Sequence, residues 1–311
     1  MKSHALRIIF SLCTIPLLES EVTKAEESAP NPVISTNDCS PVSCRFVPER
    51  KDDFAWENDL LAFRAYGPAI KSTGGSEDSG IDCWLKRTTK PIIDKWYEGN
   101  QKGISYHQDH GEGYDPYHVG ASRGCGGTAL WQDSNLVGAG PYKTWTILDR
   151  TPVKCVFELT YDYPAKQGED AIREVKRFTV ERGKPFIRTD SLFTRNGKPL
   201  SDLPVAIGVT THDGKAAVSL DVKNRWASCW EVIDGQGLGT GVILSPGSVV
   251  EVRDFKSAQK DQSHALLITK TDAHGMVTCY PGFAWVPEGR VASPADWERI
   301  LNTFSEKLAA R

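Results

Sequence analysis

The chain has 311 residues, of which 40% are apolar and 25% charged, with a mean hydropathy of −0.37. This length and composition suit a globular protein with a buried core, and they exclude a disordered tail or a membrane-embedded chain. Lysine and arginine number 37 against 40 acidic residues, a net charge of −3, so no basic field attracts a phosphate backbone and we expect no nucleic-acid partner.

Residues 1–25 have the pattern of a secretory signal peptide. Lys2 and Arg7 precede an apolar run over residues 8–18, which is too short for a membrane-spanning helix. We expect cleavage near Ala25 and a secreted or periplasmic product that is not attached to a membrane. Residues 26–50, rich in Ser, Pro, Asn and Glu, are expected to be a linker or leader before the folded body.

The cysteines do not indicate a zinc site. Seven remain after Cys13 leaves with the signal, and no C-x-x-C pair occurs. Cys39 and Cys44 can form a local disulfide in an oxidising compartment. We expect the other five to be small buried hydrophobic residues.

From Lys51 onwards the pattern indicates strands joined by turns. Residues 54–67 form two short runs joined at Asn58-Asp59, as in a hairpin. Apolar residues recur at every second position from Val153 to Tyr161, the period of a half-buried strand. Further strands are expected at residues 176–180, 186–193, 204–210, 241–244, 248–255, 264–270 and 276–285.

One clear helix closes the chain, and a shorter one is expected at residues 91–97. Ser293 can cap the closing helix, Pro294 suits its first turn, and Asp296 places a negative charge near its N-terminus. Its apolar stripe consists of Trp297, Ile300, Leu301, Phe304 and Leu308. Because strands follow strands with few helices between them, we predict an all-β, mainly antiparallel fold: one large β-sandwich domain over residues 51–311 with a C-terminal helix.

Residues 103–127 carry the residues suited to chemistry. Seven of these 25 residues are glycine, which lets a backbone approach a ligand closely. The candidate catalytic residues of this segment are His107, His110, His118, Tyr106, Tyr117 and Arg123. Imidazole, phenol, carboxylate and guanidinium groups on one glycine-rich segment predict a polar pocket.

Three interpretations of this segment remain open. His107 and His110, at H-x-x-H spacing, with His118 or a carboxylate such as Glu112, can supply ligands for a divalent cation. A histidine can instead act as a general acid or base near neutral pH. In the third interpretation the glycines set turns and the histidines satisfy carbonyl groups of a structural loop.

Other candidates lie outside this segment. His212 follows an apolar strand and is a further catalytic candidate at a sheet rim. Indoles next to charged or amide groups suit stacking on sugar rings, although large aromatic residues also fill cores. The candidate substrate-binding residues are Trp56, Glu57, Asn58, Glu112, Trp226 and Trp230.

Several runs resemble a bacterial family catalogued as domain of unknown function 4861. They are residues 53–59, 63–68, 79–82 with Trp84, 105–112, 122–127 and Asp296-Trp297. The resemblance covers residues 51–311 and implies a supersandwich related to galactose mutarotase, a fold shared with aldose epimerases and several polysaccharide lyases. It also implies an exported protein that accompanies enzymes degrading uronic-acid glycans.

These observations favour a carbon–oxygen lyase or dehydratase that performs β-elimination on uronic-acid oligosaccharides. Such a reaction needs a group that neutralises the carboxylate, a base at C5 and an acid at the leaving oxygen. Arg123, or a cation on His107 and His110, is the candidate for the first role. His118 or His212 is the candidate base, and Tyr106 or Tyr117 the candidate acid.

Two alternatives belong to other classes. A mutarotase-like epimerase would use a histidine as acid and Glu57 or Glu112 as base. A carbohydrate-binding protein without catalysis would need only aromatic residues and hydrogen-bond donors.

Overall fold

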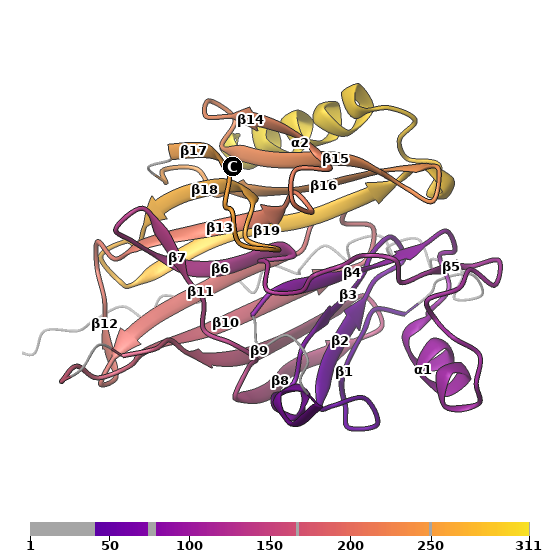
Figure 1. Ribbon diagram of the computed structural model, residues 1–311, viewed down its shortest axis with the longest axis horizontal. Coiled ribbons are helices and arrows are strands. Elements are labelled where there is room, and N and C mark those ends of the chain that lie inside the picture. Colours follow the sequence, from indigo (N-terminus) through magenta and orange to yellow (C-terminus); the bar gives the residue numbers. More distant parts are fainter. Residues whose placement is uncertain (1–40, 74–78, 166–167, 249–250, 311) are drawn as a thin grey trace, which may run out of the picture. The chain divides into compact units, whose positions relative to one another are not determined.

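Three antiparallel β-sheets make up most of the fold (Figure 1), in a computed structural model that describes residues 41–73, 79–165, 168–248 and 251–310. The N-terminal sheet has the order β1-β2-β3-β4-β5 and the third sheet the order β17-β18-β13-β6-β7. The large sheet has the order β14-β15-β16-β19-β11-β10-β9-β8, with β12 paired to β11. The described residues form one compact unit, and the signal-peptide pattern lies outside them.

The strands have the following bounds. The N-terminal sheet contains β1 (Ser43–Val47), β2 (Asp53–Glu57), β3 (Ala62–Ala65), β4 (Ile81–Lys86) and β5 (Gly113–Tyr114). The third sheet contains β6 (Cys125–Gln132), β7 (Asn135–Val137), β13 (Pro204–Thr210), β17 (Glu251–Phe255) and β18 (His264–Lys270). The large sheet contains β8 (Thr144–Thr151), β9 (Lys154–Asp162), β10 (Ile172–Glu181), β11 (Arg188–Arg195), β12 (Lys198–Pro199), β14 (Ala217–Asp221), β15 (Trp226–Ile233), β16 (Gln236–Leu244) and β19 (Met276–Trp285).

The described residues form few helices. They are α1 (Ile93–Gln101), α2 (Pro294–Ala309) and two short 3₁₀ turns, Pro68–Thr73 and Val286–Glu288. Figure 1 shows α2 over β15 and β16 and α1 beside the N-terminal sheet. The predicted all-β class with a C-terminal helix is therefore confirmed. None of the helices in the described part of the chain combines the length and apolarity needed to cross a membrane.

The expected leader extends too far. Residues 43–47, assigned to it from composition, form β1 and pair with β2. Cys44 is buried there as a free thiol, in the same core cluster as Cys155 of β9, so this segment belongs to the folded body. The expected partner Cys39 lies outside the described residues.

The large sheet has two apolar faces because its side chains alternate. On one face, odd-numbered residues of β9 and β19 join two core clusters, one under the N-terminal sheet and one under the third sheet. On the other face, Ile243 and Ala284 pack against α2. Alternation therefore divides the large sheet into an inner face covered by two sheets and an outer face that α2 covers in part.

The C-terminal helix forms as its sequence predicts. The Ser293 hydroxyl accepts a hydrogen bond from the Asp296 backbone N–H at 3.3 Å, and Pro294 opens the helix. Trp297 and Leu301 are buried on the large sheet, and the rest of the stripe is partly buried there. The Trp297 indole N–H also donates to the Ser228 hydroxyl at 2.9 Å, which fixes the helix on β15.

A buried arginine joins the N-terminal sheet to the glycine-rich segment. Arg64 on β3 donates to Asp82 on β4 at 2.5 Å and to Asp115 at 3.0 Å, and Asp53 lies 3.8 Å away. All four side chains are buried, and the Tyr106 hydroxyl also contacts the guanidinium at 3.3 Å. Arg64 thus holds three carboxylates, one of which belongs to the segment that carries the histidines.

We predict that Arg64→Met lowers the free energy of unfolding by about 3–5 kcal/mol, because it leaves Asp82 and Asp115 buried without their cation, whereas Asp53 keeps Arg50 at 3.0 Å. Arg173→Met is the matched control, since Arg173 forms an exposed ion pair with Asp162 at 2.8 Å and should cost at most about 1 kcal/mol. Urea unfolding of the two variants measures the difference. Equal losses would show that the buried cluster does not anchor the fold.

Candidate functional site

The candidate site lies at one end of the third sheet, where loops from three neighbouring strands meet. His118 precedes β6, His212 follows β13, and Asp261 precedes β18. These strands are adjacent and antiparallel, with Thr210 opposite His264 and Val209 opposite Cys125. The start of β6, the end of β13 and the start of β18 therefore lie at the same edge, and the sheet carries the loops on a rigid base.

The glycine-rich segment is divided into buried and exposed side chains. Tyr106, Asp115, Tyr117 and Arg123 are buried, whereas all three histidines of the segment are exposed. The buried side chains attach the segment to the sheets, and the histidines face outwards. Residues 125–127, expected to belong to this loop, instead begin β6.

Most of the glycines in this segment serve the fold and not a ligand. At Gly124, with φ of +55°, an added Cβ would collide with the Ile81 backbone. At Gly120, with φ of +52°, it would collide with the Asp261 carboxylate and lie 2.8 Å from His118 Nε2. The expectation that these glycines admit a ligand is therefore corrected: they let the segment pack against the chain itself.

His212 forms one histidine–carboxylate pair. Its Nδ1 lies 2.7 Å from Glu231 Oε2 and its Nε2 lies 2.7 Å from the His118 carbonyl oxygen. Since a carboxylate and a carbonyl both accept, both ring nitrogens carry protons and the ring is an imidazolium. Burial disfavours this charge, but the hydrogen bond and negative charge of Glu231 outweigh it and raise the pKa of His212.

His118 forms a second pair of a different kind. Its Nε2 lies 3.2 Å from both carboxylate oxygens of Asp261, whose backbone N–H donates to Asp213 Oδ1 at 2.7 Å. The His118 side chain is 59% exposed, and its ring centre lies 6.5 Å from that of His212. A carboxylate on one nitrogen leaves the other to take up a proton, so His118 is suited to act as a base.

Both pairs line one polar cleft of about 550 Å³. Lys215 and Lys260 line it too, are exposed, and form no ion pair with the described part of the chain. The lining residues are Pro116, His118, His212, Asp213, Lys215, Glu231, Val232, Ile233, Asp234, Lys260 and Asp261. The lining therefore carries two histidines, four acidic residues and two lysines, and Lys215 and Lys260 are the groups that can meet a negative charge on a ligand.

A second hollow of about 580 Å³ adjoins this cleft and shares Asp234 with it. The Tyr114 hydroxyl donates to Asp234 Oδ2 at 2.7 Å. Arg87 lies over the Trp285 ring at 5.6 Å and pairs with Asp109 at 2.6 Å. The turn between β15 and β16 thus separates two neighbouring hollows, each of sugar size.

His107 and His110 are not in the cleft with His118 and His212. His107 lines the second hollow, and its Nδ1 donates to the Asp115 carbonyl at 2.8 Å. His110 lies in a third hollow near Trp96, and its Nε2 donates to the Ser105 carbonyl at 3.0 Å. Of the four candidate histidines, the structure therefore brings together only His118 and His212.

The expected cation site is not assembled. Besides the carbonyl contacts of His107 and His110, Glu112 pairs with Lys95 at 2.7 Å. Among residues 41–73, 79–165, 168–248 and 251–310, no group of three His, Cys, Asp or Glu side chains has the arrangement to hold a metal ion. The H-x-x-H spacing did not place its side chains together because it lies on a loop and not on one helix face.

Arg123 cannot meet a substrate carboxylate, contrary to expectation. It is 2% exposed, and its guanidinium donates to Ser79 Oγ at 2.7 Å and to the Thr128 carbonyl at 3.1 Å. Burial lowers its pKa to about 10. Its backbone N–H donates to His264 Nε2 at 2.9 Å, so the residue holds the segment onto β18.

The two tyrosines proposed as acids are also buried. Tyr106 packs against Trp84 and Tyr97 under α1. The Tyr117 hydroxyl has no hydrogen-bond partner in the described chain, burial raises its pKa well above the usual value, and its ring meets His212 edge-on at 4.8 Å. Tyr117 therefore supports the His212 ring but does not present its hydroxyl to the cleft.

Trp56, Glu57 and Asn58 are parts of the fold and not of a sugar site. Trp56 packs on Phe157 and Phe178 in the core. Glu57 accepts from the N–H groups at the start of α1 and pairs with Lys86 at 2.8 Å, so it replaces a helix cap. The Asn58 amide closes the β2–β3 turn and donates to the carbonyls of residues 181 and 184.

Trp226 and Trp230 point away from the cleft because successive side chains of β15 face opposite sides of the sheet. Glu231 faces inwards with Cys229, so both even-numbered indoles face α2. The Trp226 indole N–H donates to Asn302 of α2 at 2.8 Å. Both tryptophans therefore fix α2 on the sheet, and Glu112 is placed apart from them by its pair with Lys95.

Sequence reasoning missed several residues of the cleft. Glu231 and Asp261 hold the two histidines, and Lys215 and Lys260 supply positive charge. The strand at residues 226–233 was not predicted from the sequence. Had it been, Glu231 would have stood out as an acidic residue at an alternating position that faces inwards. We find no such signal for Asp261, which pairs with a residue 143 positions away.

These features define the class of the protein: an antiparallel β-sandwich with two histidine–carboxylate pairs in one cleft. The chain belongs to the family described as domain of unknown function (DUF4861), whose model matches residues 19–311, as the resemblance implied. It is 35% identical over 274 residues to uncharacterized protein P7 of Formosa agariphila, which covers 85% of this chain and 67% of that protein.

Solved structures resemble the chain only remotely. A heparinase III has a TM-score of 0.39 at 10% identity over 80% of this chain and 36% of its own. A putative aldose 1-epimerase from Klebsiella pneumoniae has a TM-score of 0.38 at 7% identity over 86% and 87%. An alpha-galactosidase from Lactobacillus brevis has a TM-score of 0.34 at 8% identity, and the chain spans 39% of it. No reaction is inferred from these likenesses.

We predict that Glu231→Gln lowers the pKa of His212, because the variant removes the negative charge that stabilises the imidazolium. An NMR titration of the His212 ring measures the change. Asp261→Asn, which acts on His118, is the control and should leave His212 unchanged. An unshifted His212 in the Glu231 variant would contradict the assigned pair.

His264 makes the fold sensitive to acid. Burial and the positive Arg123 lower its pKa to about 3, so it is neutral when folded. Since the unfolded chain takes up this proton near pH 6.5, stability is lost as the pH falls from about 6.5 to about 3, by at most about 5 kcal/mol. We predict a smaller loss in His264→Gln, measured by urea unfolding between pH 7 and pH 4. Parallel curves for the two proteins would rule out this linkage.

Proposed function

We propose that this chain is an exported carbohydrate-active enzyme, a carbon–oxygen lyase that cleaves uronic-acid oligosaccharides by β-elimination in the His118–His212 cleft. One observation carries the proposal: two histidine–carboxylate pairs line a single polar cleft. Export is supported by the signal pattern of residues 1–25, and the adjoining hollow supports an oligosaccharide as ligand.

The reaction assigns one task to each pair. His118, oriented by Asp261, removes the proton at C5 of the uronide. The electrons of the C5–H bond form the C4=C5 double bond, and the C4–O4 bond breaks with its electron pair on the leaving oxygen. His212, protonated beside Glu231, gives that oxygen its Nε2 proton, which it otherwise donates to the His118 carbonyl oxygen.

The substrate carboxylate must be neutralised before C5 becomes acidic enough. Arg123 is buried, so this role passes to Lys215 and Lys260 at the rim of the cleft. Their charges stabilise the negative charge that develops on the carboxylate as the proton leaves.

A mutarotase-like epimerase is the second candidate, and the Glu231–His212 pair favours it because acid and carboxylate are adjacent. The bases first considered for it do not fit, since Glu57 caps α1 and Glu112 pairs with Lys95. A binding protein without catalysis would require neither pair.

One assay separates these functions. Incubation with oligogalacturonate, oligomannuronate, oligoguluronate and oligoglucuronate is expected to give rising ultraviolet absorbance, because elimination creates a conjugated double bond. A change in optical rotation without absorbance would instead identify an epimerase. Binding without either change would refute catalysis at this cleft.

We predict that His118→Ala and His212→Ala each lower the rate of elimination by about 10²–10⁴-fold, the usual contribution of an acid or base. His110→Ala is the matched control and should retain the rate, because His110 lies in a different hollow. Initial rates of absorbance and circular dichroism spectra measure activity and folding. Loss of activity in the His110 variant alone would overturn the assigned cleft.

A further inference from the structure

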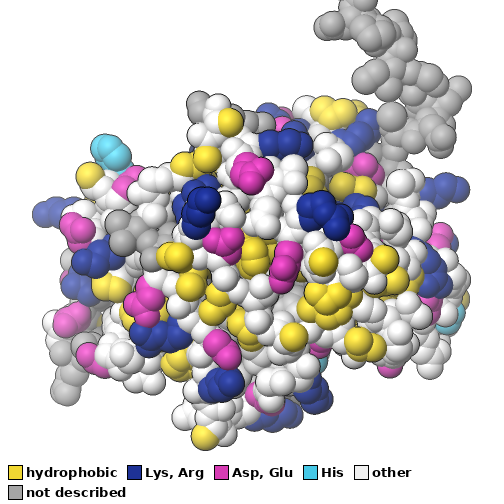
Figure 2. Space-filling model, turned by 90° about the horizontal axis from the view of Figure 1, so that it is seen from above, with side chains coloured by type: hydrophobic (Ala, Val, Ile, Leu, Met, Phe, Trp, Pro, Cys, Tyr) yellow, Lys and Arg dark blue, Asp and Glu magenta, His cyan; other side chains and the backbone are white. Residues whose placement is uncertain are grey.

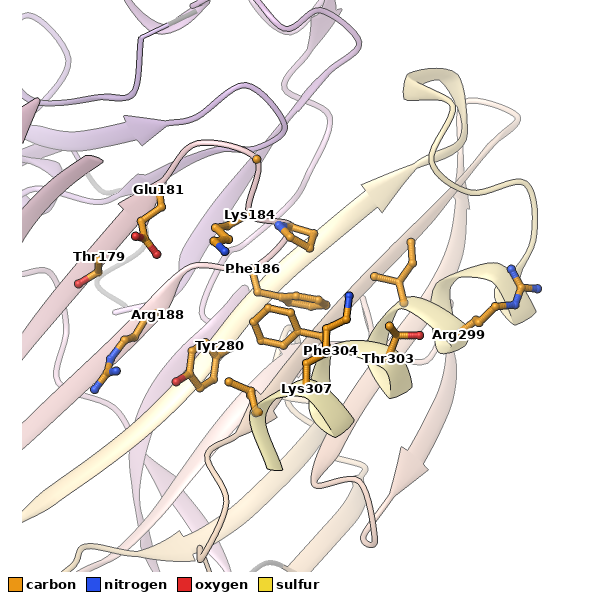
Figure 3. A pocket seen from close by; sticks show the side chains of 14 residues that line it. Thr179, Glu181, Lys184, Phe186, Arg188, Tyr280, Arg299, Thr303, Phe304 and Lys307 are labelled. Atoms are coloured by element: carbon orange, nitrogen blue, oxygen red, sulfur yellow. The ribbon is translucent and has the colours of Figure 1, made fainter. Parts of the chain in front are cut away.

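A groove that is separate from the cleft lies on the opposite face of the large sheet. It runs between α2 and the outer face of β10, β11 and β19 and has a volume of about 470 Å³. Tyr280 and Phe304, both partly exposed, form its aromatic floor over the buried Phe186, and Figure 3 shows the three rings gathered beside the helix. The ring centres of Phe186 and Phe304 lie 4.5 Å apart, and those of Tyr280 and Phe304 lie 5.5 Å apart.

The rim of this groove is basic. Figure 3 shows Lys184 and Lys307 close to the aromatic floor and Arg188 next to Tyr280. Neither lysine forms an ion pair with the part of the chain that the structure describes. Arg188 pairs with Asp190 at 2.8 Å, and Glu181 is the acidic residue of the lining. Charge complementarity therefore calls for an anionic ligand.

The groove is separate from the cleft because strand alternation sends neighbouring residues to opposite faces. Tyr280 lies on the outer face of β19, whereas Cys279 faces the inner core. Seen from the side of α2, hydrophobic side chains lie among Lys, Arg, Asp and Glu side chains (Figure 2). A ligand in the groove would not contact the His118 and His212 pairs.

We propose that this groove is a second binding site for an acidic oligosaccharide of the class that the cleft acts on; the proposal rests on the proposed function for that class. Aromatic rings provide apolar faces on which pyranose rings stack. Lys184 and Lys307 bind sugar carboxylates, while Glu181, Thr179 and Thr303 exchange hydrogen bonds with sugar hydroxyls. An acyl chain would leave these hydroxyl and carboxylate groups without partners, so an acidic sugar fits better than an anionic lipid.

The test reverses the charge of the rim. Lys184→Glu combined with Lys307→Glu is expected to lower the retardation of the protein at least tenfold in native gels containing polygalacturonate, polymannuronate, polyguluronate or polyglucuronate. Lys198→Glu combined with Lys270→Glu is the matched control, because both lysines are exposed, lie outside the groove and give the same change in net charge. Thermal unfolding of both variants checks that they fold.

Two further measurements separate this inference from the proposed function. The groove variant should cleave uronate disaccharides at the wild-type rate but the polymer more slowly, because only the polymer reaches both sites. If polyuronates retard the wild-type protein but are not cleaved, the proposed lyase activity is refuted and the proposed binding site in the groove stands. Equal retardation of groove variant and control, no retardation of the wild type by any polyuronate, or preferential binding to phosphatidylglycerol vesicles would overturn the groove.

Discussion

The buried guanidinium of Arg64 is the interaction on which the rest of the site depends. It offers one positive charge to three carboxylates that water cannot reach, and one of these, Asp115, belongs to the glycine-rich segment. The Asp115 backbone then bonds to Tyr106 and His107, so the middle of the segment is fixed on the N-terminal sheet. Such a cluster adds little net stability, but its geometry tolerates few alternatives. It fixes Asp115, three positions before the exposed His118.

The two-residue period of the strands explains the distribution of chemistry over the molecule. In β15, the Glu231 side chain faces inwards and contacts His212, whereas the Trp226 and Trp230 side chains face outwards and contact α2. The same large sheet thus supports a polar cleft at one edge of its inner face and an aromatic groove on its outer face. Strand alternation alone places Glu231 and the aromatic residues of the groove, whereas His118, His212 and Asp261 reach the cleft from the loops at the ends of β6, β13 and β18.

The fold was more readily predicted than the site. Residues 264–270 and 276–285 were expected as strands with the bounds they have, and the closing helix followed from Ser293 and the apolar stripe. The glycine-rich segment contributes one predicted residue, His118, to the candidate cleft. Its residues were assigned by residue type, and residue type does not reveal burial. Arg123 and Tyr117 lie between the strands β5 and β6 and are nevertheless buried. The partners of the histidines were missed because His118 and Asp261 are 143 residues apart and only the order β18-β13-β6 makes them neighbours.

Placing three loops at one edge of a sheet has a consequence for how such proteins diversify. Backbone groups form the hydrogen bonds between β6, β13 and β18, so the pairing of these strands does not depend on the sequence of the connecting loops. Insertions before β6 or β18, or after β13, can therefore accumulate in relatives without loss of the scaffold. Two proteins with this framework can act on different sugars although their cores are interchangeable, and their specificities are to be compared loop by loop.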